Sequence, residues 1–534
     1  MPISQLSALA DLIDCDQEPI LVPGCIQPNG VLLVLDRQGF AIENVAGDTS
    51  FVLGVEREHV IGHSLSTLLD TQAESFVAAQ LGSPSANVAP IICLRVRSHN
   101  GSLPLDLTLS ASERTVIIAL EPARRTAIDG RDPIAQLKTL LSALHHTDSV
   151  QEGCEAATSA LRAATGFERA MAYRFLDDGS GVVVAEDAAP GLEPFLGLRY
   201  PASDIPMQAR ELYKRNWLRV IPDVDYVPAP LLPPINARTG KPVDMSQCAL
   251  RSVSPIHLEY LRNMGVRASM SVSVMFRNEL WGMLLLHHAA PRHVSTDLRV
   301  ACETFAQIFS LHVEAKTQTE LAILRINTRA IREEIVFRLL HARDAGTALC
   351  SPDLLRYTAA TGAAVHYDGR LHCIGETPSS ADIMDLIRWL DAQQGTVYAT
   401  DQLSLEYPPA LSYSGVASGL LAVAVSREPR NHVLWFRQEV VKIVKWAGDP
   451  TKQVRGNTPG IGAAGSGAAG SGVPGIGAPG IRLAPRKSFA MWPNEKRDSS
   501  SPWSEVHIEA AESLRVLLLE TTLKGVVAGR SEFH

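Results

Sequence analysis

Runs of hydrophobic residues separated by polar turns divide the chain into three mixed segments, and the first extends from Gly30 to about Glu121. Within it, several runs predict strands and the stretch HSLSTLLDTQAESFVAAQL predicts a helix. The strand runs are VLLVLD, FAIENVA, APIICLRVRS, PLDLTLSA and TVIIALE. Strands gathered around one short helix favour an α+β domain with an antiparallel sheet.

The second segment covers roughly residues 150–313 and follows a helical pattern near 133–164. Its strands are predicted at RAMAYRFL, GVVVAED, SMSVSVMF and LWGMLLLHH. Among them lies PDVDYVPAPLLPPINARTGKPVDMSQ (222–247), which carries too many prolines for a helix or a central strand. A connection of that length inside a compact domain is usually functional.

A third α+β segment occupies about residues 330–534, and a long helix leads into it. Neither proline nor glycine occurs from Asp297 to Ala345, and the residues there favour helix. An unbroken helix of this length would measure about 70 Å, so we expect it to join two domains. The Gly- and Ala-rich tract at 456–480 cannot form a core and predicts a flexible loop.

Composition limits the possible functions. The chain has 534 residues, 46% of them hydrophobic, which suffices for roughly three or four domains. The net charge of −8 comes without a basic stripe, which argues against nucleic acid as the main partner. No apolar run reaches the roughly 20 residues that cross a membrane. The N-terminus lacks the basic start and long apolar core of a secretory signal, so we expect a cytoplasmic protein without membrane contact.

The eight cysteines are scattered, without a CxxC pair or a Cys/His cluster at zinc spacing. They predict reduced, mostly buried thiols and no metal site. Cys15 stands apart because it lies in the polar stretch DCDQEPILVPGCIQPNG, beside Asp14 and Asp16. Neighbouring carboxylates raise the pKa of a thiol, so any reaction of Cys15 requires a partner that is itself reactive.

Several motifs together resemble those of one family, the bacterial phytochromes, which are red-light receptors with a covalently held linear tetrapyrrole. The arm CDQEPI…PGCIQPNG is similar to their chromophore-attachment segment. GFERAMAYRF, RYPASDIPMQARELYKRNWLR, LRSVSPIHLEYLRNMGV and LWGMLLLHH are similar, in this order, to their bilin pocket. APRKSFAMW followed by PWSEVHIEAAESLR is similar to the segment called the tongue. The resemblance covers nearly the whole chain, and the combination of PASDIP, SPIHLEYL and PRxSF makes it specific.

The resemblance implies three mixed α+β domains in the order PAS, GAF and PHY, with antiparallel sheets joined by long helices. The expected bounds are 1–122 for the arm and PAS domain, 123–313 for the bilin-binding GAF domain, and 314–534 for the PHY domain, with its tongue at about 446–503. It also implies a figure-of-eight knot, in which the arm passes through the proline-rich GAF loop with Ile26 at the crossing. Knots are rare, so sequence alone would not suggest one.

Carried over to this chain, the resemblance makes Cys15 the thioether link to a vinyl side chain of biliverdin. Cys25 falls where the family has no attachment, although a competing adduct there is conceivable. Arg219 and Arg251 correspond to the arginines that bind the two propionates, since a guanidinium fork suits a carboxylate. The neutral donors around the same groups would be Ser254, Ser269 and Ser271.

The resemblance also assigns residues around the rings of the tetrapyrrole. These are Tyr173, Tyr200, Asp204, Ile205, His257, Tyr260 and His287. Asp204 and His257 would lie beside the pyrrole nitrogens, with His257 suited to exchange a proton near neutrality. His287 would lie near the carbonyl of the last ring, and the three tyrosines would surround that ring. Taken singly, such residues are more often ordinary core residues.

The tongue is expected to couple the pocket to the output. In the family this segment exchanges a hairpin for a helix, and here Arg486 and Ser488 would contact Asp204 in alternate states. Trp446 and Trp503 correspond to the tryptophans at the two ends of the tongue. Some positions depart from the family pattern: Leu198 replaces a frequent histidine, and the tract at 456–480 lengthens the tongue.

The sequence therefore predicts a red/far-red photoreceptor that acts on a downstream module or response regulator, as a homodimer and without catalytic activity of its own. One alternative is a fragment of a light-regulated sensor histidine kinase. Another is a PAS/GAF sensor of haem or a small metabolite that does not respond to light. No kinase signature and no phosphate-binding glycine loop occurs in the chain.

Overall fold

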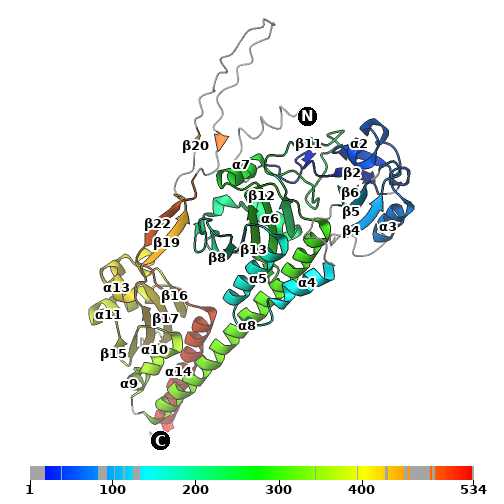
Figure 1. Cartoon of the computed structure of the whole chain (residues 1–534). Coiled ribbons are helices and arrows are strands. Elements are labelled where there is room, and N and C mark those ends of the chain that lie inside the picture. Colours follow the sequence, from blue (N-terminus) through cyan, green and yellow to red (C-terminus); the bar gives the residue numbers. More distant parts are fainter. Residues whose placement is uncertain are drawn as a thin grey trace. The chain divides into compact units, whose positions relative to one another are not determined.

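The computed structural model describes residues 18–37, 39–81, 93–101, 103–111, 115–123, 133–342, 344–393, 395–426, 431–449, 455–456, 482–483 and 488–531. The chain divides into two compact units, whose elements Figure 1 labels. Unit 1 contains residues 1–315 and 445–492, and unit 2 contains residues 316–444 and 493–534. The helix expected from residues 297–345 is α8 (Thr296–His341), which contributes to both units.

The first sheet of unit 1 has five antiparallel strands in the order β3-β2-β6-β5-β4. The strands are β2 (Val31–Asp36), β3 (Ile42–Ala46), β4 (Cys93–Arg97), β5 (Pro104–Ala111) and β6 (Thr115–Pro122). Short helices accompany them: α2 (Thr49–Leu53), η2 (Arg57–His59), η3 (Leu65–Thr67) and α3 (Thr71–Leu81). The predicted helix over 63–81 is thus shorter, because Asp70 caps α3 by accepting from Ala73 N at 3.1 Å.

Alternate residues of β2 face two different cores, as the pleat of a strand requires. Leu33 packs in the core that also holds Val77 of α3. Leu32 packs on the other face with Ile26 and Leu231. The arm and the proline-rich loop therefore cover the second face of the sheet.

The arm lies between the proline-rich loop and the segment that follows this loop. Strand β1 (Cys25–Ile26) pairs with β11 (Ala229–Pro230), the one short strand described within the loop over 222–247. On the other side, Ser252 N donates to Cys25 O at 3.1 Å. Ile26 is fully buried between the two segments. These contacts fit a crossing at Ile26, and the knot itself stays a prediction.

The second sheet has eight strands in the order β10-β12-β13-β7-β8-β9-β19-β22. The strands are β7 (Arg169–Phe175), β8 (Gly181–Ala188), β9 (Arg199–Tyr200), β10 (Leu218–Ile221), β12 (Ala268–Phe276), β13 (Glu279–His288), β19 (Lys442–Ala447) and β22 (Met491–Lys496). Its helices are α4 (Pro133–Ser142), α5 (Val150–Thr165), η5 (Ala202–Asp204), α6 (Met207–Arg215) and α7 (Pro255–Asn263). One pairing departs from the antiparallel pattern: β19 lies parallel to β9, with Trp446 opposite Arg199.

The two faces of this sheet bury different side chains. Leu284 of β13 packs with Leu161 of α5 and Phe305 of α8, two helices that lie along the sheet in Figure 1. Met283, the residue before Leu284, points to the opposite face and packs with Tyr173. The second face is therefore lined with aromatic residues and is free of these helices.

Unit 2 holds a five-stranded antiparallel sheet in the order β15-β14-β18-β17-β16. The strands are β14 (Gly362–Tyr367), β15 (Arg370–Gly375), β16 (Val397–Thr400), β17 (Gly419–Ser426) and β18 (Asn431–Arg437). Its helices are α9 (Ala345–Leu349), α10 (Pro352–Thr358), α11 (Ser380–Asp391), α12 (Leu403–Glu406), η6 (Pro408–Tyr413), α13 (Ser414–Ala417) and α14 (Glu505–Ser531). Helix α14 lies beside the second part of α8 in Figure 1, and Arg325 bonds Glu505 at 3.3 Å and Glu509 at 3.0 Å.

A short pair formed by β20 (Arg455–Gly456) and β21 (Arg482–Leu483) completes the described strands. Within the described ranges, no helix has the length and apolar character to span a membrane. A cytoplasmic location stays a prediction.

Candidate functional site

Helix α7 brings two of the expected residues to one face. Pro255 opens the helix, where its fixed backbone angle suits the first turn. His257 and Tyr260 follow three residues apart, so they lie on neighbouring turns, and their rings stack with centroids 6.0 Å apart and planes inclined by 11°. Tyr260 Oη donates to Asp204 Oδ2 at 3.1 Å. Burial, and then Asp204, raises the pKa of Tyr260 well above its usual 10, so this tyrosine is a neutral donor.

The three expected tyrosines meet in one aromatic cluster. Tyr173 and Tyr200 form an edge-to-face pair at 5.8 Å, and Tyr260 forms another with Phe489 at 5.0 Å. The ring of Tyr173 has room because residue 181 is glycine, since a Cβ there would overlap that ring. The full cluster contains Met171, Tyr173, Phe175, Val183, Phe195, Leu198, Tyr200, Ile205, Tyr213, Tyr260, Met264, Met283, Leu285, Ala447 and Phe489.

The two expected arginines lie next to the arm. Arg219 is buried on β10 and donates to Ala249 O at 3.2 Å and to the carbonyl of Arg251. Arg251 is also buried and donates to the carbonyl of Ile20. Burial, and then the positive charge of Arg219, lowers the pKa of Arg251 to about 9. Neither arginine forms an ion pair among the described residues, and the hydrogen bonds found for both cations go to backbone carbonyls.

The expected serines lie around these cations and across the sheet. Ser271 is directly opposite Arg219, and Ser269 is opposite His287. Ser254, just before α7, donates to Glu18 Oε2 at 2.6 Å. Glu18 belongs to the arm, so this bond ties the arm to the start of α7.

The histidines are held neutral. Burial, and then the charge of Arg219, lowers the pKa of His257 to about 4. Burial, and then Arg169, lowers the pKa of His287 to about 3, and its Nδ1 has no hydrogen-bond partner in the described part of the chain. The expectation that His257 exchanges a proton near neutrality stays a prediction; in this structure burial and, second, the charge of Arg219 favour the neutral form of the ring.

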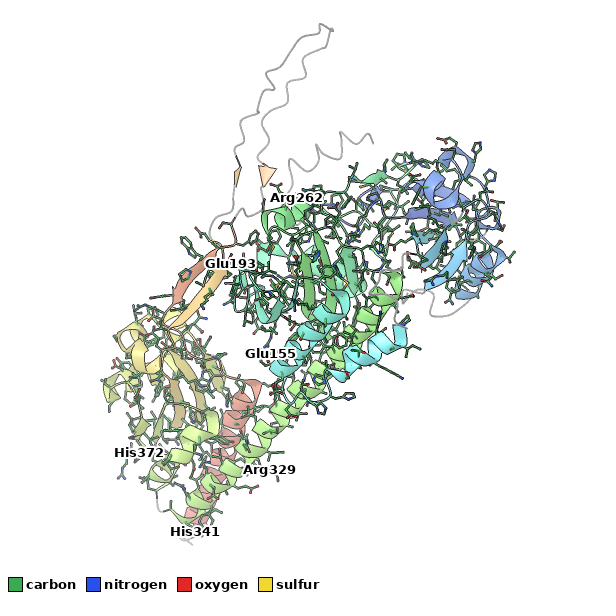
Figure 2. All side chains as sticks on the ribbon, in the orientation of Figure 1. Glu155, Glu193, Arg262, Arg329, His341 and His372 are labelled. Atoms are coloured by element: carbon green, nitrogen blue, oxygen red, sulfur yellow. The ribbon has the colours of Figure 1, made fainter. Side chains whose placement is uncertain are left out.

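One buried pair behind the cluster is not indicated by any sequence motif. Arg169 on β7 and Glu186 on β8 are joined at 2.7 Å, with side chains 7% and 5% exposed. Arg169 also donates to Glu193 O at 2.6 Å and lies 3.8 Å from the ring centroid of Phe195. Glu186 accepts from the amides of Phe195 and Leu196, each at 2.8 Å. The pair thus fixes the loop that carries Phe195 into the cluster; Figure 2 labels Glu193 on that loop.

The expected tongue residues are found in different places. Trp446 lies on β19, and the guanidinium of Arg199 is 5.4 Å from the centroid of its ring. Ser488 is exposed next to Phe489. Trp503 lies outside the eight-stranded sheet, in unit 2, where its Nε1 donates to Thr400 O at 3.1 Å. Cys15 and Arg486 lie outside the described residues.

The residues present fit a linear tetrapyrrole with two carboxylates. Arg219 and Arg251 offer two buried cations that form no ion pair within the described ranges, and such forks bind carboxylates well. The aromatic cluster offers an apolar lining. His287 lies on β13 two residues after Leu285 of this cluster, and its Nδ1 has no hydrogen-bond partner among the residues described. Asp204 and Tyr260 add one acceptor and one donor.

Comparisons with known proteins agree with this geometry. The model described as "PAS fold" matches residues 15–123, "GAF domain" matches 149–314, and "Phytochrome region" matches 328–461 and 474–526. Cyanobacterial phytochrome B of Nostoc sp. is 36% identical over 518 residues, which cover 96% of this chain and 66% of the relative. A bacteriophytochrome of Xanthomonas campestris is 30% identical over 530 residues, which cover 95% of this chain and 78% of the relative.

A solved structure, the wild-type phytochrome photosensory core module of Stigmatella aurantiaca, shares 36% identity with this chain at a TM-score of 0.79. The match covers 96% of this chain and 99% of that one. Fold and site together define a sensory module of PAS, GAF and PHY domains. The chain belongs to the phytochrome family of photoreceptors. It spans 66% and 65% of the length of the first two curated relatives.

Proposed function

We propose that this chain is the red/far-red sensory part of a bacteriophytochrome, with biliverdin held by a thioether to Cys15. The observation that carries the proposal is the pair of buried arginines, Arg219 and Arg251, which lie beside the arm and form no ion pair with any residue that the structure describes. Glu18, three residues after Cys15, bonds Ser254 at 2.6 Å. This contact supports attachment of the pigment next to the arginines.

Each arginine would bind one carboxylate of the pigment. Burial of a cation is unfavourable, in keeping with the lowered pKa of Arg251, which arises first from burial and then from the charge of Arg219. An incoming carboxylate would remove the cost and form charge-assisted hydrogen bonds. Ser271, opposite Arg219 on the neighbouring strand, would supply a further donor.

Asp204 and His257 would serve the pyrrole nitrogens. All four nitrogens carry hydrogens in the resting state of the family, so a positive charge requires acceptors close by. Asp204 offers a carboxylate, and a neutral His257 offers an acceptor nitrogen. His287, whose Nδ1 is unpaired in the described structure, would hydrogen-bond the carbonyl of the last ring.

The pigment, when bound, supplies light absorption and the double bond about which its last ring turns. Tyr173, Tyr200 and Tyr260 would define the space for that turn, because edge-to-face rings leave a rigid apolar border. The hydrogen bond from Tyr260 to Asp204 links this border to the polar centre of the site.

The tongue would transmit the change. We assign Arg486 as the ion-pair partner of Asp204 in one state and Ser488 as its partner in the other, with refolding of the tongue between them. Phe489, the neighbour of Ser488, already packs on Tyr260, which supports this assignment. The role of the chain is sensory rather than catalytic, and a downstream module or response regulator would receive the signal.

We also propose a parallel homodimer. On α8, Ile326, Phe337 and Leu340 are 68%, 61% and 72% exposed, and their spacing places them on one face of the helix. Figure 2 labels Arg329 and His341 on the same part of α8. A second copy of the helix would cover this apolar face.

One spectroscopic experiment tests the function. Purified apoprotein is incubated with biliverdin and illuminated alternately with red and far-red light. The proposal predicts a red-absorbing form that interconverts reversibly with a far-red-absorbing form. A haem sensor would instead show a Soret band with added haem and no photoconversion. A kinase fragment would show phosphate transfer from ATP.

A further inference from the structure

Arg437 ends strand β18, at the point where residues 438–500 leave the body of unit 2 and later return to it. Its side chain is buried, with the residue 7% exposed. We call the place where residues 437–438 and 501–502 meet the neck. The guanidinium of Arg437 donates to the end of α10, where it bonds Thr358 O at 2.8 Å and Ala359 O at 3.2 Å. On the returning side, it bonds Pro502 O at 2.7 Å and Ser501 O at 3.2 Å.

The charge of Arg437 is balanced without a carboxylate, since none of the ion pairs found among the described residues includes it. Thr358 is the last residue of α10, and the end of a helix where carbonyls point outward favours a cation. The ring of Trp503 lies on the other side, with its centroid 3.8 Å from the guanidinium carbon. Burial lowers the pKa of Arg437 to about 10, which leaves it charged at neutral pH.

Two other hydrogen bonds also join residues on the two sides of the neck. Val440 N donates to Ser499 O at 2.8 Å, and Asp498 N donates to Glu439 Oε1 at 2.7 Å. Arg437 differs from them because one rigid fork joins three segments: the end of β18, the end of α10 and the residues just before α14. A lysine could not replace it, because an ammonium group has no planar set of five donors.

We propose that Arg437 is the positioning residue that closes this neck and determines where α14 begins. Closing a loop of roughly 60 residues has an entropic cost, which the buried fork and the stacked indole offset at a single point. A change in the conformation of residues 438–500 is then transmitted to the first turn of α14 instead of being absorbed by a loose loop. This consequence for signalling rests on the proposed photoreceptor function, whereas closure of the neck does not.

The experiment compares three variants with the wild-type chain by amide hydrogen exchange of the apoprotein. Arg437→Met keeps the length of the side chain and removes its charge and donors. Arg437→Lys keeps the charge and removes the fork. Arg497→Met is the matched control, because Arg497 is an exposed arginine of the same excursion and bonds only Glu495 in the described structure.

We expect exchange of the amides over 501–507 to accelerate at least tenfold in Arg437→Lys and further in Arg437→Met, with no change in Arg497→Met. Exchange in β14 and β17 should stay within twofold of the wild type. If Arg437→Met does not fold, Arg437→Lys decides alone. Unchanged exchange over 501–507 in Arg437→Lys, or equal acceleration throughout unit 2, would overturn the assignment.

A second measurement, on protein loaded with biliverdin, addresses signalling. Arg437→Lys should leave the yield of covalent adduct and the red absorption maximum unchanged, and should change the rate of thermal reversion after illumination at least threefold. An unchanged rate would contradict the transmitted role. If the wild-type chain forms no adduct, the proposed function fails, and the exchange result still decides whether Arg437 closes the neck.

Discussion

The buried pair of Arg169 and Glu186 gives a sharp test of how the aromatic site is held. Removing one member of such a pair leaves the other charge buried without its partner, which lowers the free energy of unfolding by about 3–5 kcal/mol. After Arg169→Met, Glu186 still accepts from two backbone amides. After Glu186→Met, Arg169 keeps the Glu193 carbonyl and the Phe195 ring, while both amides lose their acceptor. Because an unpaired buried amide costs about 1–3 kcal/mol, we expect about 3 kcal/mol for Arg169→Met and at least about 5 kcal/mol for Glu186→Met.

Urea unfolding of the apoprotein, followed by circular dichroism, measures these differences. In the double variant Arg169→Met/Glu186→Met no charge is buried alone, so its cost should fall below the sum of the single costs by about 3 kcal/mol. Arg162→Met is the matched control: its pair with Asp187, at 3.1 Å, also involves a carboxylate of β8, but the two side chains are 29% and 27% exposed. We expect about 1 kcal/mol or less for this control. Two results would refute the reasoning. One is a double variant whose loss of unfolding free energy equals the sum of the two single losses within about 0.5 kcal/mol. The other is a loss in Arg169→Met no larger than the loss in Arg162→Met.

Three further predictions follow from the same structure. Because the folded-state pKa values of His257 and His287 lie at about 4 and about 3, below the ordinary 6.5, the unfolded chain takes up protons first as pH falls. Their contribution to stability is present above pH 6.5 and is lost towards pH 4, so urea midpoints of His257→Gln should vary less with pH than those of the wild type; parallel curves would contradict this. Gly181→Ala should displace the Tyr173 ring and at least halve the photoconversion yield of the biliverdin adduct, whereas an unchanged yield would show that the ring can move freely. Ile326→Glu should shift the protein from dimer to monomer in sedimentation experiments, and an unchanged dimer would exclude this face of α8 as the interface.

Individual helices and strands could be predicted because residues close together in the sequence determine them. The runs VLLVLD and PLDLTLSA coincide with β2 and β5. The absence of proline and glycine predicted α8 to within a few residues at each end. Prolines excluded regular structure from the loop over 222–247, where only the two-residue strand β11 is found.

Other features depend on contacts between distant segments, which no local pattern contains. The parallel pairing of β19 with β9 joins residues far apart in the sequence. The partners in the Arg169–Glu186 pair are 17 residues apart on two strands, and an isolated arginine or glutamate gives no sign of burial. The low pKa of His257 arises from its burial and, second, from Arg219 on β10, and the residues next to a histidine in the sequence indicate neither.

In the candidate site, too, some features could be predicted from the sequence and others could not. The motifs of the family indicated which residue types gather, and Asp204, His257 and Tyr260 do lie together. They did not indicate that the loop behind Phe195 is fixed by a buried charge pair, nor that Trp503 stacks on Arg437. These contacts depend on the tertiary packing of strands and loops rather than on any motif.

The most direct test of the central claim is peptide mass spectrometry of the protein after incubation with biliverdin and tryptic digestion. The account predicts that the peptide ending at Arg37 gains the mass of one biliverdin, and that fragment ions place this mass on Cys15 rather than Cys25. The same digestion of Cys15→Ser should yield only unmodified peptide. A pigment found on Cys25 or on a GAF-domain cysteine, or no covalent adduct at all, would contradict the account.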